Sequence, residues 1–99
     1  MSEINTRLAL LKTDLGLIRL TADQSAYLNN LLTMAASAIT REGVTLTAND
    51  AECDGLVAMY AGWMYRKRQQ QTEEAMPRML RWQLNNMLAH QKMEARNDL

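Results

Sequence analysis

Apolar side chains recur at every third or fourth position along most of this chain, and this spacing most constrains its fold. The first segment has the stripe Ile4, Leu8, Leu11 and Leu15. Such spacing places the side chains on one face of a helix. Gly16 follows as the expected stop, because glycine tolerates the left-handed conformation that closes a helix. We therefore predict an amphipathic helix that ends near Gly16.

A second helix is predicted to begin after Thr21. Thr21 and Gln24 fit a capping box, in which each side chain bonds to a backbone N–H that the helix leaves free at its start. Gly43 is the expected stop of this helix. Its predicted core face holds Leu28, Leu31, Leu32, Ala35, Ala38 and Ile39. The alanines on this face leave room for a neighbouring helix to approach closely.

The third predicted helix is preceded by the cap-like pair Asn49 and Glu52 and runs to about residues 69–71. Its expected core face is Cys53, Leu56, Val57, Tyr60, Ala61 and Met64. Met59 and Trp63 fall on an adjacent stripe, which a single small core cannot easily cover. We therefore expect part of this helix to contact other molecules.

A polar linker over residues 69–75 separates this helix from a fourth one. Pro77 is expected in the first turn of the fourth helix, where the N–H that proline lacks would have no partner. The core stripe of this helix, Leu80, Leu84, Met87 and Leu88, should continue to about Gln91. Only residues 43–47 alternate apolar and polar side chains, and this stretch is too short to build a sheet.

These elements predict an all-α fold, a small bundle of about four helices. One helical domain is expected over residues 1–91, followed by a charged C-terminal tail over 92–99 that frays. Apolar residues make up 47% of the chain, which is too many for a disordered protein. Phe is absent and Met occurs eight times. Methionine suits surfaces that pack against more than one partner, although it is also a good helix former.

The charge balance gives no general attraction to nucleic acid, since 11 basic residues match 11 acidic ones. The distribution is uneven: residues 1–65 carry a net charge of −3 and residues 66–99 a net charge of +3. The single cysteine, Cys53, excludes an intramolecular disulfide and a cysteine-based zinc site. We expect neither a secretory signal nor a membrane-spanning segment, because no long apolar stretch occurs.

No pattern of catalytic or cofactor-binding residues is found, and we expect no enzyme activity, catalytic residue, cofactor or metal. Cys53 and His90 are the one possible Cys–His pair, but a cysteine on a core face is inert. The acids Asp50, Glu52 and Asp54 resemble the start of a calcium loop, yet the required glutamate is missing further on. Acidic residues at a helix N-terminus are the simpler interpretation.

A small DNA-binding regulator of helix-turn-helix type is the alternative function. Arg78, Arg81 and Gln83 on the fourth helix are side chains that can address a DNA groove. The predicted loop before this helix is longer than the turn of that motif, and the neutral overall charge offers no support.

The order of motifs in the second half resembles a known family. Residues 59–68 read MYAGWMYRKR, residues 76–82 read MPRMLRW, and Asn85-Asn86 follow. In this order and spacing they resemble the small head–tail connector (adaptor) proteins of tailed bacteriophages with long non-contractile tails. Residues 11–16 and 41–44 are similar to the end of that family's first helix and to its exit from the second helix.

The resemblance implies a structural virion protein and a set of partners. Such proteins form a ring, expected to be dodecameric, beneath the portal protein of a DNA-filled head. The ring extends the DNA channel, through which viral DNA passes without sequence-specific binding. It also provides the docking platform for the stopper (head-closure) protein and the tail. The implied location is the virion, with assembly in the cytoplasm of the host bacterium.

The resemblance also implies where partners bind. The segment from Pro77 onward is expected to dock on the portal, and Asp50, Glu52 and Asp54 are candidates to line the channel. The predicted partner interface consists of Tyr60, Trp63, Arg66, Arg68, Met76, Pro77, Arg78, Arg81, Trp82, Asn85 and Asn86.

Overall fold

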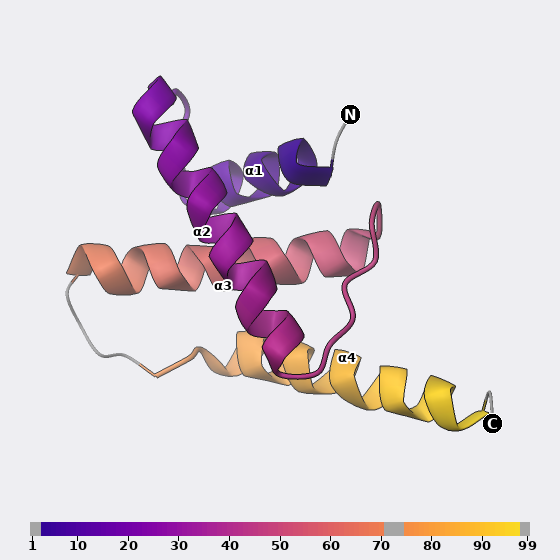
Figure 1. The fold of residues 1–99 in the computed structure, drawn as a ribbon. Coiled ribbons are helices and arrows are strands. Elements are labelled where there is room, and N and C mark those ends of the chain that lie inside the picture. The colour runs from indigo at the N-terminus through magenta and orange to yellow at the C-terminus, as the bar shows by residue number, and fades with distance from the viewer. Residues whose placement is uncertain (1–2, 71–74, 98–99) are drawn as a thin grey trace.

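A computed structural model describes residues 3–70 and 75–97 of the chain. It contains the helices α1 (Glu3–Asp14), α2 (Ala22–Arg41), α3 (Ala51–Gln70) and α4 (Arg78–Asn97). No strand occurs within the described ranges, so the predicted all-α bundle is confirmed. Figure 1 shows α2 crossing α3 and reaching α4 with its C-terminal end, while α1 packs behind the upper half of α2.

The start of α2 forms as predicted, but the cap of α3 lies one residue later than expected. Thr21 Oγ1 accepts from the Gln24 amide at 3.1 Å, and Gln24 Oε1 accepts from the Thr21 amide at 2.9 Å. Asn49 was the expected cap of α3, yet its backbone is left-handed, with φ 61°. Asp50 Oδ1 instead accepts from the amides of Glu52 and Cys53, at 2.9 and 3.4 Å. The prediction of Asn49 was therefore wrong, because Asn49 makes the turn that brings Asp50 into the capping position.

The two predicted glycine stops are confirmed. Gly16 follows α1 with φ 72°, and Gly43 follows α2 with φ 107°. At Gly43 an added Cβ would also lie 3.2 Å from Cδ1 of Leu88, so the end of α2 lies close against α4. Both positions therefore favour glycine through their backbone angle, and Gly43 also through its packing.

The core is drawn from all four helices and closely follows the predicted stripes. Its buried apolar members are Leu11, Leu28, Leu31, Leu32, Ala35, Ile39, Val44, Cys53, Leu56, Val57, Ala58, Ala61, Leu80 and Leu84. Ala38, Tyr60 and Met64, also predicted for core faces, are only half-buried. Met59 and Trp63 are likewise half-buried and pack against this core. The largest side chains of α3 thus lie at the edge of the core, where partner molecules can reach them.

Helix α4 differs from its predicted bounds at both ends. It begins at Arg78, and Pro77 directly precedes it, with the Pro77 carbonyl accepting from the Arg81 amide at 3.0 Å. The helix continues past Gln91 to Asn97, so its predicted end near Gln91 is wrong, while fraying of the tail stays a prediction. No Gly or Pro interrupts it, and His90 pairs with Glu94 one turn later at 2.8 Å. Residues 71–74 of the predicted linker lie outside the described residues.

Candidate functional site

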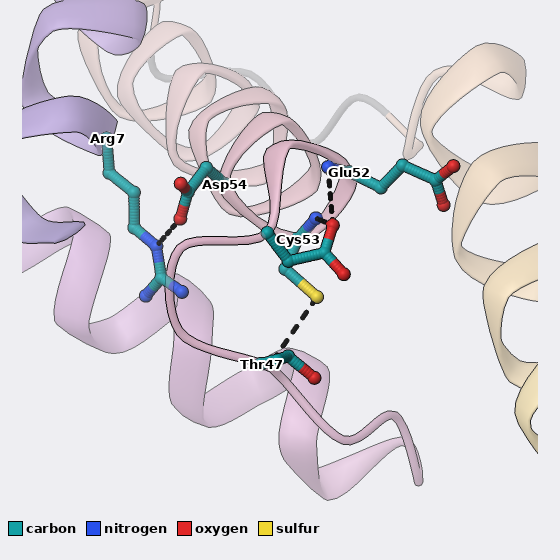
Figure 2. Close-up of polar contacts among 6 residues, drawn as sticks. Arg7, Thr47, Glu52, Cys53 and Asp54 are labelled. Atoms are coloured by element: carbon teal, nitrogen blue, oxygen red, sulfur yellow. Dashed lines mark hydrogen bonds and ion pairs between the residues drawn. The ribbon is translucent and has the colours of Figure 1, made fainter.

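The acidic cluster at the start of α3 has a structural role. Asp54 is buried at 4% exposure, and Oδ1 accepts from Nε of Arg7 on α1 at 2.7 Å. Figure 2 shows Arg7 reaching across from α1 to this carboxylate, with Cys53 on the adjoining turn. The suggestion that Asp54 lines a channel is therefore wrong, because its carboxylate is held inside the subunit. Asp50 caps the helix, which leaves Glu52 as the exposed acid of the three.

The residues considered for catalysis or metal binding contact other groups within the subunit. Cys53 is buried, and its Sγ accepts from the Thr47 amide at 3.4 Å. His90 is exposed on α4, and its Nε2 lies 2.8 Å from Oε1 of Glu94. Within residues 3–70 and 75–97, no group of three His, Cys, Asp or Glu residues is placed to hold a metal ion.

The outer surface of α4 is the first candidate for partner binding. Met79, Trp82 and Met93 lie on the side of the helix opposite the buried Leu80 and Leu84, and are 65%, 62% and 64% exposed. Their spacings place them in one row, here called the α4 stripe. Large apolar residues exposed in a row mark a surface that other molecules cover.

Polar and basic side chains flank the α4 stripe. Arg78 and Arg81 are both exposed, as are Asn85 and Asn86. Arg81 Nη1 donates to Oε1 of Glu42 at 2.8 Å, so this arginine helps to hold α4 against the end of α2. Arg78 forms no ion pair with a residue of the described ranges. Of the two predicted arginines, Arg81 is therefore held within the subunit, and Arg78 is available to a partner.

Arg66, predicted as a partner contact, lies at the junction of α1 and α3. Its Nη2 donates to Oδ2 of Asp14 at 2.9 Å and to the Asp14 carbonyl at 3.1 Å. A cation at this position satisfies an open carbonyl at the C-terminus of α1. Gly62 allows this approach, since a Cβ there would lie 2.7 Å from Asp14 Oδ2. Arg66 thus has a role within the subunit.

A groove between α2 and α3 is the second candidate, with a volume of about 620 Å³. We call it the α2–α3 groove. Its lining residues are Thr33, Met34, Ser37, Ala38, Arg41, Tyr60, Trp63, Met64, Lys67 and Arg68. Among the described residues, three basic side chains and no acidic one line the groove. The groove therefore combines an apolar floor with a basic rim.

Aromatic contacts fix the floor of the α2–α3 groove. The rings of Tyr60 and Trp63 meet edge to face, with centroids 5.5 Å apart. Lys67 Nζ lies 5.1 Å from the centre of the Trp63 ring, and Arg68 lies over Tyr27 at 5.8 Å. Trp63 Nε1 is buried and has no hydrogen-bond partner in the described structure.

The environment of Tyr60 links the groove to the attachment of α4. Burial raises the pKa of the Tyr60 hydroxyl above its ordinary value, and the nearby Glu42 carboxylate raises this pKa further. Arg81 and Arg41 act in the opposite direction and lower it. Tyr60 therefore responds to the same Glu42–Arg81 pair that joins α2 to α4.

The structure separates the predicted interface residues into distinct places. Tyr60, Trp63 and Arg68 line the groove, whereas Arg78, Arg81, Trp82, Asn85 and Asn86 lie on exposed parts of α4. Pro77 is exposed before α4, and Met76 is half-buried against the core. Sequence reasoning missed Met34, Met79 and Met93 as exposed residues. Their exposure could have been predicted, because each lies off the core stripe of its own helix.

None of the helices in the described ranges is long and apolar enough to cross a membrane. Comparison of the chain with protein-family models, curated proteins and solved structures found no match.

Proposed function

We propose that this protein is a head–tail connector (adaptor) subunit of a long-tailed bacteriophage. The α4 stripe is the observation that carries the proposal, because it places Met79, Trp82 and Met93 on the segment that such a subunit uses to dock. The order of the motifs in residues 59–68 and 76–86 supports the same function. A small all-α subunit with more than one candidate partner surface suits a protein that joins other assemblies.

In this proposal α4 docks on the portal protein. Trp82 and Met79 enter an apolar depression of the partner, and Arg78 pairs with a carboxylate at its edge. Buried tryptophans and arginines contribute more to binding than most other interface residues, so Trp82 and Arg78 are the expected anchors. The tethered Arg81 fixes the orientation of the helix through Glu42.

Ring formation requires two different contact surfaces on each subunit. Subunits that close a ring use two different surfaces, since each copy contacts its neighbours head to tail. The ring extends the channel for viral DNA beneath the portal and offers its free side to the stopper protein. The protein acts in the virion and assembles in the host cytoplasm.

The decisive experiment measures binding to the purified portal protein and separates docking from folding. The Arg78→Ala/Arg81→Ala variant should lose at most about 1 kcal/mol of stability, because exposed ion pairs contribute little. Its affinity for the portal should fall by about tenfold or more. Trp82→Ala should weaken binding at least as much and leave thermal melting unchanged. Ile18→Ala, at a site 84% exposed on the α1–α2 connection, is the matched control.

Two results would contradict the proposal. The first is a wild-type chain that binds neither portal nor DNA-filled heads, as judged by sedimentation and native mass measurement. The second is submicromolar, sequence-selective binding to short duplex DNA with a steep salt dependence, which would favour a helix-turn-helix regulator.

A further inference from the structure

The α2–α3 groove has features that the docking of α4 does not use. It is built by two helices outside α4, and its lining includes Met34, which is 50% exposed. Met34 and Ala38 of α2 line it together with Trp63 and Met64 of α3. Methionine side chains are flexible and adapt to apolar side chains of different shapes. The floor is thus suited to receive apolar side chains from another molecule.

The rim of the groove selects for negative charge. Arg41, Lys67 and Arg68 line it, and no acidic residue of ranges 3–70 and 75–97 does. Lys67 lies over the Trp63 ring, which keeps its ammonium group next to the apolar floor. A ligand that places apolar side chains on the floor would therefore have three cations beside it.

We propose that the α2–α3 groove binds an amphipathic helix of a partner protein, with an apolar stripe flanked by carboxylates. Recognition of this kind places the apolar face of a helix in a groove and its charged residues at the edge. Residues 33–41 of α2 span about 12 Å, so the ligand helix would contact the groove over roughly two turns. The inference depends on the groove alone and not on the connector function.

Two other occupants fit the groove less well. A second copy of this chain would present the α4 stripe, which around Trp82 is flanked by Arg78, Arg81, Asn85 and Asn86 and not by carboxylates. Single-stranded nucleic acid would stack bases on an exposed aromatic face. Lys67 already lies over the Trp63 ring and competes with a base for that face.

The test uses the full-length chain and two designed peptides of 14 residues (roughly four helical turns). Both carry a leucine stripe, flanked by glutamates in one and by lysines in the other. Calorimetric titration should show the glutamate peptide binding at least tenfold more tightly, with an affinity that falls as salt is raised. Met34→Asp and Lys67→Glu/Arg68→Glu should each weaken this binding at least fivefold. Ile18→Asp should leave it unchanged, and circular dichroism verifies that each variant folds.

Several results would overturn the inference. Equal affinity for the two peptides would show that the rim does not select charge. Binding that survives in both Met34→Asp and Met34→Gln would place the peptide elsewhere. A free chain that sediments as a dimer, and that Met34→Asp converts to a monomer, would identify a second copy as the occupant. Displacement of the glutamate peptide by an equimolar short DNA strand would identify nucleic acid instead. The α4 docking test is unaffected, because its variants lie on another helix.

Discussion

Helices α1 and α4 are attached to the same core in contrasting ways. Leu11 of α1 is fully buried, and Arg7 forms a buried ion pair with Asp54 on α3. Helix α4 contributes Leu80 and Leu84 to the core, but its ion pair with Glu42 is exposed. Figure 1 shows α4 along the lower edge of the molecule, with its C-terminal end extending beyond the other helices.

The difference shows that one small domain attaches one helix through a buried charge pair and another through an exposed one. A buried charge pair is costly to break, because the charge that remains is shielded from water and loses that carboxylate. An exposed pair costs little to break, because water replaces the lost partner. Helix α1 is therefore committed to the fold, whereas α4 keeps an apolar row available at little cost to stability.

The largest expected effect comes from breaking the buried pair. Asp54→Ala should lower the free energy of unfolding by about 3–5 kcal/mol, since Arg7 would lose its carboxylate partner inside the protein. Glu42→Ala, which breaks the exposed pair with Arg81, should cost about 1 kcal/mol or less. Urea unfolding followed by circular dichroism measures both. Equal losses in the two variants would mean that α1 and α4 are held in the same way.

The next largest effect is a difference in stability between substitutions on the buried and the exposed side of α4. Leu80→Ala should cost about 2–5 kcal/mol, because Leu80 is buried and its loss leaves a cavity. Met79→Ala, at the adjacent exposed position, should change stability by about 0.5 kcal/mol or less. Thermal melting of the two variants makes the comparison. A large loss for Met79→Ala would show that the α4 stripe is part of the fold and not a free surface.

The smallest effect is a pH dependence at the junction of α2, α3 and α4. The pKa of Tyr60 is raised in the folded protein, mainly by burial and then by Glu42. The folded state therefore binds the phenolic proton more tightly than the unfolded chain, whose Tyr pKa is about 10. This contribution is fully present below about pH 10 and is lost as the pH rises through the raised value. Tyr60→Phe should lose less stability than wild type between pH 8 and pH 11 in urea unfolding, and an identical loss would contradict this role.

Sequence reasoning recovered what short-range patterns encode. The stripes with Leu28 and Leu80, the Thr21–Gln24 box and the stop at Gly43 depend on residues a few positions apart, and all are confirmed. The Arg7–Asp54 pair joins positions 47 apart, and no helical periodicity reports such a contact.

The candidate surfaces were only partly predictable for the same reason. Trp82 and Trp63 were identified from motifs, but the groove requires Met34 of α2 to meet Lys67 of α3, and that depends on how two helices cross. The α3 cap was missed for a local reason, the backbone conformation of one residue. The left-handed backbone of Asn49 moves the capping role to Asp50, and the pairing of Asn49 with Glu52 in the sequence does not report that backbone conformation.

The separation of Arg7 and Asp54 along the chain also affects the order of events during synthesis. At about 5–20 residues per second, a ribosome makes Asp54 roughly 2–9 s after Arg7. Helix α1 has 12 residues, a length at which an isolated helix is marginal in water. We therefore expect the nascent N-terminal segment to remain solvated until α3 has emerged, so that α1 docks only on a chain already translated past its midpoint.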